Sequence, residues 1–315
     1  MLLKVNIKLK RNDPCSCGSG KKYKKCCQDT SESTLSVFQP PQQKIETTAN
    51  GKAPSPVEIN ELVALFNTGR HAELEKRTRL LVTQYPDSGL VWKALGASLL
   101  AQGKEALPAL QKAIEFLPKD AEAHYNLGNS LREIGQFDSA VASYRRALEI
   151  KPDFAEAHYN LGYILNDLGQ FDDAVASYRR ALEIKPDFAQ AHYNLGNALQ
   201  TLGQIDDAVT SYRRALEIKP DYAEAHSNLG VALQTLGQNE DAVTSFRRAL
   251  EIKPDYVEAH SNLGITLKAL GQIDDAVASY RRALEIKPDY AEAHSNLGVA
   301  LQTLGQNEDA VTSFR

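Results

Sequence analysis

The feature that most constrains the fold of this chain is a sequence period of 34 residues. Proline recurs at this interval, and a Leu-Gly dipeptide and a later alanine recur with it. A regular period of this length is typical of a unit of two antiparallel helices that stacks on its neighbours. The repeated prolines are Pro118, Pro152, Pro186, Pro220, Pro254 and Pro288. We therefore expect an all-α fold, a superhelical solenoid of antiparallel helix pairs.

Each unit carries signals for the ends of its two helices. An Asp followed three residues later by Glu or Gln, as at Asp153 and Asp187, predicts the N-terminus of the first helix, because its side-chain oxygen can accept from backbone N–H groups. A glycine then predicts the turn, because glycine adopts positive φ without strain. The recurring proline predicts the end of the second helix. The turn glycines are Gly135, Gly169, Gly203, Gly237, Gly271 and Gly305.

We count eight units, and the first and last are irregular. They start at residues 55, 89, 121, 155, 189, 223, 257 and 291. The second unit is short at its turn, so Pro108 is expected in the first turn of its second helix, where proline is tolerated. The sequence stops at Arg315 inside the second helix of the last unit, and we expect the parent protein to continue beyond it.

The unit resembles the tetratricopeptide repeat (TPR). Trp92-Lys-Ala-Leu95-Gly96 matches the start of that family's pattern, and Ala147 and its copies match a later alanine. The resemblance covers residues 55–315 and implies a protein-binding solenoid whose first helices line the inner wall. The motif Ala-x-Ala-His-x-Asn-Leu-Gly is most similar to the TPR arm of O-linked N-acetylglucosamine transferases, in which an asparagine ladder binds the substrate backbone.

The sixth position of the regular units is asparagine, a poor helix former. A carboxamide offers both a donor and an acceptor, so it can bind a peptide group whatever its side chain. On the resemblance, these residues would hold an extended polypeptide, with Tyr125, Tyr159 and Tyr193 beside them. The asparagines are Asn126, Asn160, Asn194, Asn228, Asn262 and Asn296. Duplication of an exposed polar position is the alternative interpretation.

The residues around this ladder change along the array. Tyrosine occupies the wall in the first half, and serine with Val231, Ile265 and Val299 replaces it in the second. The groove would then have an aromatic and an aliphatic end, and drift between duplicated units is the alternative. The tyrosines are Tyr125, Tyr159, Tyr163 and Tyr193, and the serines are Ser227, Ser261 and Ser295.

Histidine occupies the fourth position of the same units, which raises the question of a metal site. Neighbouring units are about 10 Å apart, whereas zinc ligands lie ~2 Å from the metal. We therefore favour packing and hydrogen bonding. The histidines are His124, His158, His192, His226, His260 and His294. The Arg-Arg pairs of the second helices, such as Arg145-Arg146, predict a solvated outer face and not a nucleic-acid track.

All four cysteines of the chain lie in one short segment. Cys15, Cys17, Cys26 and Cys27 have C-x-C-x8-C-C spacing, and four thiolates can close a tetrahedral zinc site. Residues 11–27 resemble the SEC-C motif, known at the end of the preprotein translocase ATPase and in assorted bacterial proteins. The resemblance implies that these cysteines bind a structural zinc ion in a zinc knuckle, with free or redox-active thiols as the alternative.

Composition divides the chain into three segments. Residues 1–29 form the SEC-C-like zinc knuckle with net charge +6, residues 30–54 form a flexible linker rich in Ser, Thr, Gln and Pro, and residues 55–315 form the acidic TPR array. The basic knuckle would dock on an acidic protein, a chaperone surface or ribosomal RNA. No signal-peptide pattern or apolar run of membrane length occurs, so we expect a cytoplasmic protein.

These features favour a non-catalytic scaffold for protein–protein interaction that binds an extended polypeptide in its groove. No nucleophile–base set, phosphate loop or paired carboxylates stand outside the repeat pattern, so we expect no enzymatic activity from this chain. The alternative function is the substrate-recognition arm of a larger transferase, similar to O-GlcNAc transferase, with a catalytic domain beyond Arg315. A third possibility is that the knuckle targets the chain to ribosomes or nucleic acid.

Overall fold

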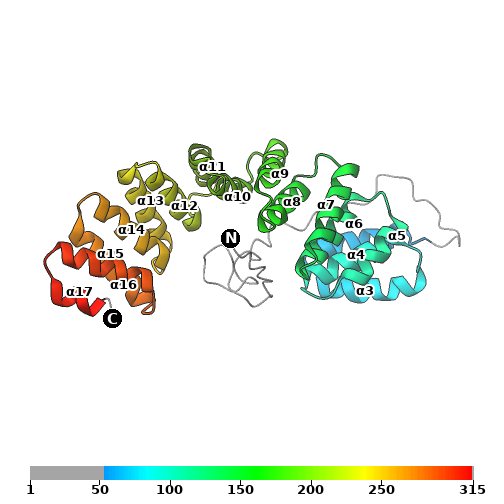
Figure 1. Ribbon diagram of the computed structural model, residues 1–315. Coiled ribbons are helices and arrows are strands. Elements are labelled where there is room, and N and C mark those ends of the chain that lie inside the picture. Colours follow the sequence, from blue (N-terminus) through cyan, green and yellow to red (C-terminus); the bar gives the residue numbers. More distant parts are fainter. Residues whose placement is uncertain (1–52, 314–315) are drawn as a thin grey trace, which may run out of the picture. The chain divides into compact units, whose positions relative to one another are not determined.

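The computed structural model describes residues 53–313, which form helices joined by short turns (Figure 1). The helices alternate between the first helix (A helix, even numbers) and the second helix (B helix, odd numbers) of each repeat. Their bounds are α2 (Pro56–Asn67), α3 (His71–Gln84), α4 (Gly89–Ala101), α5 (Leu107–Phe116), α6 (Ala121–Glu133), α7 (Phe137–Ile150), α8 (Ala155–Asp167), α9 (Phe171–Ile184), α10 (Ala189–Thr201), α11 (Ile205–Ile218), α12 (Ala223–Thr235), α13 (Asn239–Ile252), α14 (Val257–Ala269), α15 (Ile273–Ile286), α16 (Ala291–Thr303) and α17 (Asn307–Ser313).

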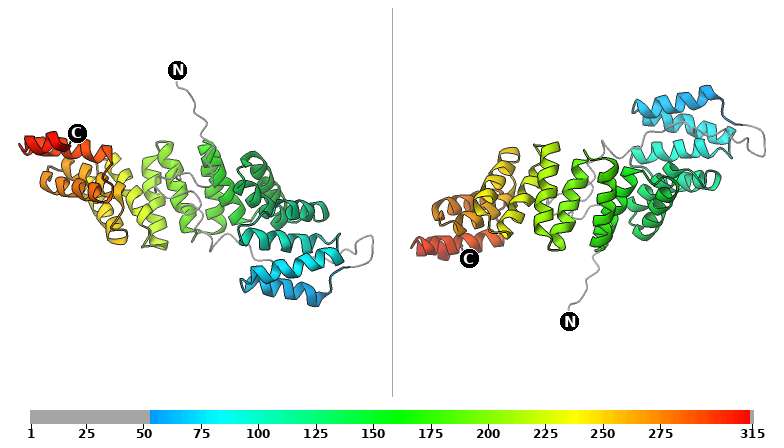
Figure 2. Two further views of the ribbon diagram at one scale, coloured as in Figure 1. Left: turned by 90° about the horizontal axis from the view of Figure 1, so that it is seen from below. Right: turned by 90° about the horizontal axis from the view of Figure 1, so that it is seen from above.

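The chain divides into two compact units, residues 1–152 and 153–315. The described part of unit 1 holds α2 to α7, and that of unit 2 holds α8 to α17. In unit 2 each helix packs on the next one along the chain, and successive A helices also contact one another. Figure 2 shows from two sides how the helix pairs of unit 2 follow one another. The predicted stacking of antiparallel helix pairs is confirmed within each unit.

The turn between the helices of a pair depends on glycine at positive φ. Gly203 has φ 77° and Gly271 has φ 76°, and the other predicted turn glycines have similar values. The predicted starts of the repeats agree with the structure, since each A helix starts at the expected residue or next to it. Pro108 lies in the first turn of α5, as expected.

The predicted aspartate caps are wrong for most repeats. The residue before α8 is Phe154 and the residue before α10 is Phe188, and neither helix has a side-chain cap. Both rings are buried, so the aromatic side chain at this position serves the core while the aspartate lies one residue further out. In unit 1 the register differs, and Asp120 Oδ1 accepts from the Ala123 backbone N–H at 2.8 Å.

Close approach of the two helices of a pair depends on a glycine within the A helix. A Cβ atom on Gly196 of α10 would lie 2.5 Å from the Tyr212 ring of α11, too close for any side chain. The ring can therefore lie flat against the A helix. Tyr212 is fully buried by this packing, as is Tyr280 in its own repeat.

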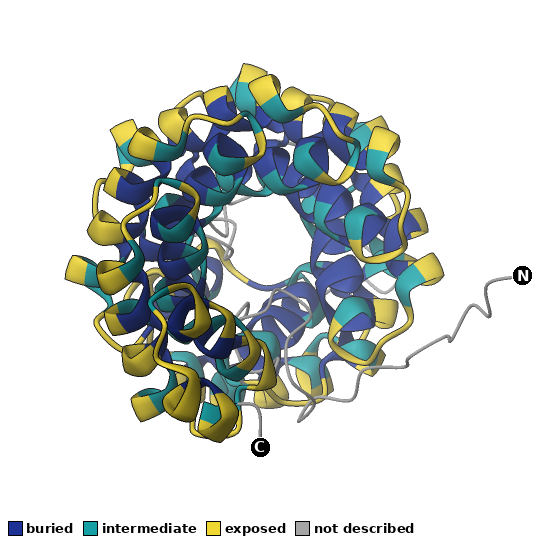
Figure 3. Cartoon of the chain, turned by 60° about the vertical axis from the view of Figure 1, so that its left-hand side comes forward, coloured by how far each residue is buried: buried dark blue, intermediate teal, exposed yellow. Residues whose placement is uncertain are grey.

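The buried and exposed residues separate between the two kinds of helix. Exposed residues are concentrated on the B helices and the turns, whereas the A helices from α4 to α14 are largely buried or intermediate. Figure 3 shows the chain coloured by burial. No helix within residues 53–313 is long and apolar enough to span a membrane. The predicted zinc knuckle and nearly all of the predicted linker lie outside the described residues.

Candidate functional site

All but the first of the predicted ladder asparagines lie on the A helices of unit 2, and these residues differ in exposure. Asn160 of α8 is fully buried. The side chains of the four A helices that follow are partly exposed, namely Asn194, Asn228, Asn262 and Asn296. Only these four are therefore in a position to meet a ligand from outside.

The first two exposed asparagines bind the preceding A helix. Asn194 Nδ2 donates to Tyr159 Oη at 3.0 Å. Asn228 Nδ2 donates to Tyr193 Oη at 3.2 Å and to Asn197 Oδ1 at 2.8 Å. These hydrogen bonds join α8 to α10 and α10 to α12, so the carboxamides hold neighbouring repeats together.

Tyr159 and Tyr193 also fill the space between repeats. The Tyr193 ring lies 6.1 Å from the Tyr212 ring and 4.8 Å from the Tyr222 ring, centroid to centroid. Tyr159 makes the equivalent contacts in the preceding repeat, 4.7 Å from Phe188. The predicted groove tyrosines are thus part of the packing between repeats as well as neighbours of the asparagines.

The last two exposed asparagines lack this arrangement. Ser227 and Ser261 stand where Asn262 and Asn296 would need a tyrosine from the preceding A helix. Neither carboxamide has a hydrogen-bond partner among residues 53–313. Val231 and Ile265 also stand where Asn197 provides the second acceptor of Asn228. Loss of these acceptors leaves two carboxamides without partners, although they are identical in sequence position to the bonded ones.

A buried tyrosine hydroxyl loses its partner in the same region. Tyr212 Oη donates to oxygens of the A helix of its own repeat, Asn197 Oδ1 and Gln200 Oε1, both at 2.8 Å. The equivalent residues opposite Tyr280 are Ile265 and Lys268, which offer no side-chain acceptor. Tyr280 Oη is buried with no hydrogen-bond partner in the described structure, and burial raises its pKa to about 12.

In unit 1 the corresponding residues are more enclosed. Tyr125 and Asn126 of α6 are both buried. On α4 a lysine, Lys93, takes the place of the tyrosine and is 2% exposed, with its Nζ 2.7 Å from Asp120 Oδ2 and 3.2 Å from Glu122 Oε2. Burial raises the pKa of Glu122, and the nearby Lys93 charge opposes that rise.

Sequence reasoning missed this buried ion pair. The available signal was a lysine at the fifth position of the second repeat, since the six regular repeats have tyrosine or serine at this position. A side chain at this position must cross the interface between repeats, so a charge there requires partners from the next unit. Asp120 and Glu122 provide them.

The predicted histidine row has a structural role. Nε2 of His192, His226 and His260 lies 3.0 Å from the carbonyl oxygen of the proline six residues earlier. Trp92 Nε1 donates to the Pro86 carbonyl at 2.7 Å in the same way. No group of three His, Cys, Asp or Glu side chains within residues 53–313 is arranged to hold a metal ion.

The B helices carry exposed ion pairs on their outer side. Arg180 contacts Glu183 and Arg214 contacts Glu217, each within the same helix. Such exposed pairs contribute little to stability. They confirm the predicted solvated outer face.

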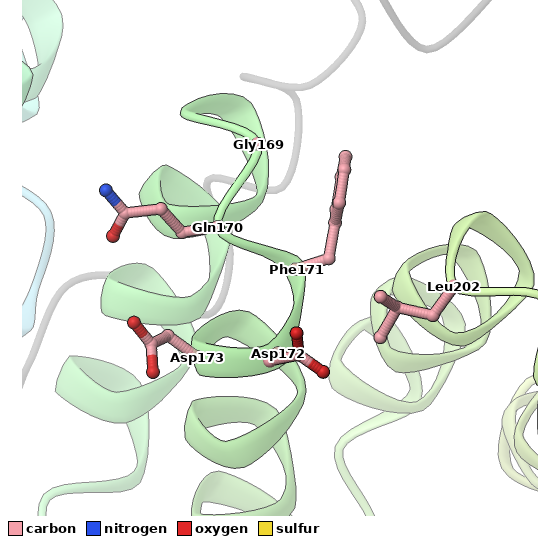
Figure 4. A pocket seen from close by; sticks show the side chains of 6 residues that line it. All are labelled: Gly169, Gln170, Phe171, Asp172, Asp173 and Leu202. Atoms are coloured by element: carbon pink, nitrogen blue, oxygen red, sulfur yellow. The ribbon is translucent and has the colours of Figure 1, made fainter.

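An open depression of about 250 Å³ lies at the turns of two neighbouring repeats. In Figure 4, Leu202 of one turn faces Phe171 and Asp172 of the other. Gly169, Gln170 and Asp173 complete the lining. These residues include no nucleophile paired with a base.

Comparison with known protein families identifies the type of repeat. Five stretches between residues 128 and 305 match the model described as TPR repeat, and residues 109–142 match a second model described as tetratricopeptide repeat. Together these matches cover more than half of the chain. The chain belongs to the tetratricopeptide-repeat family. Residues 11–29 match the SEC-C motif.

Several solved TPR structures are similar to this TPR chain. YrrB, described as a TPR protein with an unusual peptide-binding site, is 28% identical with a TM-score of 0.55, over 59% of this chain and 95% of its own. MamA is 28% identical with a TM-score of 0.51, over 53% and 97%. Cut9 with Hcn1, from the hetero-tetramer of the APC/C, is 20% identical with a TM-score of 0.58 over 79% and 49%, and shares the fold.

Curated relatives match this TPR protein over a short stretch of about 20 residues. A UPF0225 protein of Geobacter sulfurreducens is 78% identical over 23 residues, and the protein translocase subunit SecA of Elusimicrobium minutum is 82% identical over 22 residues. Each match covers 7% of this chain, and 14% and 2% of the two relatives. The chain therefore spans only a small part of the length of these relatives.

Proposed function

We propose that this TPR protein is an interaction scaffold whose unit 2 binds an extended polypeptide along its A helices. The observation that carries the proposal is the row of four partly exposed carboxamides, one on each A helix from α10 to α16. Neighbouring helices pack about 10 Å apart, and an extended chain advances roughly 3.3 Å per residue. Each carboxamide would therefore meet about every third residue of the bound chain.

The similar structures support a role in protein or peptide binding. YrrB is described as having a peptide-binding site, and Cut9 was solved in complex with a second protein. Because the matched models describe TPR repeats in general, the more specific likeness to O-GlcNAc transferase arms stays a prediction. A role as the substrate-recognition arm of a transferase is accordingly the alternative function.

We also propose that Cys15, Cys17, Cys26 and Cys27 bind a structural zinc ion. The motif match at residues 11–29 includes all four cysteines, and four thiolates leave no open position for catalysis. The lysines between them would offset the charge of the zinc tetrathiolate, and the remaining positive charge would dock the knuckle on an acidic protein or ribosomal partner.

The peptide-binding proposal is tested on an array of synthetic nine-residue peptides. Replacing all four exposed asparagines by alanine should weaken capture of the bound peptides at least tenfold. The matched control replaces Arg180 and Arg214 on the outer face of the B helices by alanine and should leave capture unchanged. Equal capture by the asparagine variant and the intact chain would remove the A-helix row as the binding surface.

A further inference from the structure

We propose that ligand recognition is concentrated on α14 and α16, and that the ligand is an extended segment in which basic and aliphatic residues alternate. The α14–α16 surface consists of three rows that run across the two helices. The carboxylates are Glu258 and Glu292, the carboxamides are Asn262 and Asn296, and the aliphatic residues are Ile265 and Val299. This inference rests on the proposed function and adds the place and the chemistry of binding.

The first argument is the hydrogen-bonding state of the carboxamides. Asn194 and Asn228 already donate to the preceding A helix, so a ligand would compete with an existing hydrogen bond. Asn262 and Asn296 have no partner among the described residues. Both of their N–H donors and their oxygen are available for the peptide groups of a bound chain.

The second argument is the order of side chains along each helix. Residues three or four apart share a face of a helix. Glu292, Asn296 and Val299 therefore form one stripe along α16, and their counterparts form the same stripe along α14. Ile265 is partly exposed on α14, so its side chain can contact a ligand. An extended chain lying on the carboxamide row would have the acidic row on one side and the aliphatic row on the other.

Charge decides which residues the acidic row accepts. In earlier repeats the glutamate of this row contacts a lysine, with Glu156 to Lys185 at 3.6 Å and Glu224 to Lys253 at 3.8 Å. Within residues 53–313, Glu258 has no such ion pair. On α16, Glu292 accepts a hydrogen bond from Tyr290. A basic ligand side chain would supply the missing counter-charge.

The geometry of an extended chain connects the two rows. Successive side chains of a strand point to opposite sides. A segment held by its backbone on Asn262 and Asn296 would direct alternate residues to the acidic row and to the aliphatic row. The surface therefore fits lysine or arginine alternating with valine, isoleucine or leucine.

A buried hydroxyl in the same region also lacks a hydrogen-bond partner. Tyr280 of α15 packs against Gly264 of α14, as Tyr212 packs against Gly196 two repeats earlier, and its hydroxyl has no partner in the described structure. The Tyr212 hydroxyl has two partners. The repeat thus lacks internal hydrogen bonds both at its surface, in Asn262, and beneath it.

The test uses two capped nine-residue probes, one alternating lysine with valine and one alternating glutamate with valine, titrated by fluorescence anisotropy. The intact chain should bind the lysine probe at least tenfold more tightly than the glutamate probe. The Asn262→Ala, Asn296→Ala double variant should weaken binding of the lysine probe at least tenfold with unchanged thermal unfolding. The Asn194→Ala, Asn228→Ala double variant should unfold at lower temperature and should weaken binding of the lysine probe less than the Asn262, Asn296 variant does.

Two sets of substitutions test whether acceptors from the preceding repeat keep these carboxamides from binding a ligand. Ser227→Tyr with Ser261→Tyr rebuilds the acceptors that Tyr159 and Tyr193 provide, and should weaken probe binding while raising the unfolding temperature. Tyr193→Ser with Asn197→Val removes both acceptors of Asn228 and should tighten binding of a lysine–valine probe long enough to reach α12.

The outcomes separate the two proposals. Binding lost only in the Asn194, Asn228 variant would overturn the location on α14 and α16 and leave the A-helix row as the binding surface. Binding unaffected by both double variants would overturn the A-helix row itself. Equal affinity for the two probes, or no binding of either, would overturn the assigned ligand chemistry.

Discussion

The hydroxyl of Tyr280 is predicted to destabilise the repeat that contains it, so Tyr280→Phe should stabilise the protein. In the equivalent place, Tyr212 Oη makes two hydrogen bonds at 2.8 Å, whereas Tyr280 Oη is buried without one. The repeat between these two already carries phenylalanine at the equivalent position. Phe246, which packs against Gly230, is fully buried and has no hydroxyl, and Val231 stands where Asn197 accepts from Tyr212.

The expected size follows from the cost of an unsatisfied polar group. A buried hydroxyl without a partner costs about 1–3 kcal/mol, and a satisfied hydrogen bond contributes about 0.5–1.5 kcal/mol net. The ring of Tyr280 keeps its packing in the phenylalanine variant. We therefore expect Tyr280→Phe to raise the free energy of unfolding by about 1 kcal/mol and Tyr212→Phe to lower it by about 1 kcal/mol.

Because repeat arrays unfold in parts, the assay must report on the repeat concerned. Urea unfolding followed by circular dichroism gives the global shift, and amide hydrogen exchange in α14 and α15 gives the local one. Ile265→Asn supplies the missing acceptor and should also stabilise, but only while Tyr280 keeps its hydroxyl. A loss of stability in Tyr280→Phe comparable to that of Tyr212→Phe would refute the reasoning, because it would require a partner for this hydroxyl.

Three further predictions concern other parts of the chain. Burial lowers the pKa of His192, His226 and His260 below the unfolded value of about 6.5, so the folded state favours the neutral imidazoles. Stability should therefore decline as pH falls from about 7 to 5, because the unfolded chain binds more protons in this range. Thermal unfolding across this range measures the decline, and its absence would contradict the prediction. Lys93→Met should lower the free energy of unfolding by about 2 kcal/mol at pH 7, because it leaves the carboxylates of Asp120 and Glu122 without their buried partner. Burial raises the pKa of Glu122, so the loss should be smaller at pH 4, and urea midpoints at both pH values measure it. Chelation should unfold residues 11–27 without altering array unfolding, as followed by zinc release and circular dichroism, and concurrent melting of the array would contradict their independence.

The helix-pair architecture could be predicted from the sequence because it depends on local signals that recur. The turn glycine and the proline act within a few residues of themselves, so their effect is visible in the spacing alone. The aspartate caps could not be predicted in the same way. Whether Asp153 or Phe154 precedes α8 depends on where the aromatic ring is buried, and that is a tertiary contact.

The position of the candidate site could be predicted from the sequence, but the hydrogen bonding of its asparagines could not. The asparagine column was visible in the sequence, and the structure leaves four of its members partly exposed. Which of those four are already hydrogen-bonded depends on residues of the preceding repeat, such as Tyr193 and Asn197 for Asn228. A repeat alignment compares equivalent positions, so a contact between different positions of neighbouring units is easily overlooked.

This dependence on the neighbouring unit explains how nearly identical repeats can differ in function. Exchange of one residue, tyrosine for serine at the fifth position, removes an acceptor from the next asparagine without changing that asparagine at all. The cost is a weaker link between two A helices, since Tyr193 also packs on Tyr212 and Tyr222. A gain in binding capacity should therefore accompany a loss of local stability at every repeat where serine replaces the tyrosine. The repeats that bind best should be those whose amides exchange fastest in the free protein.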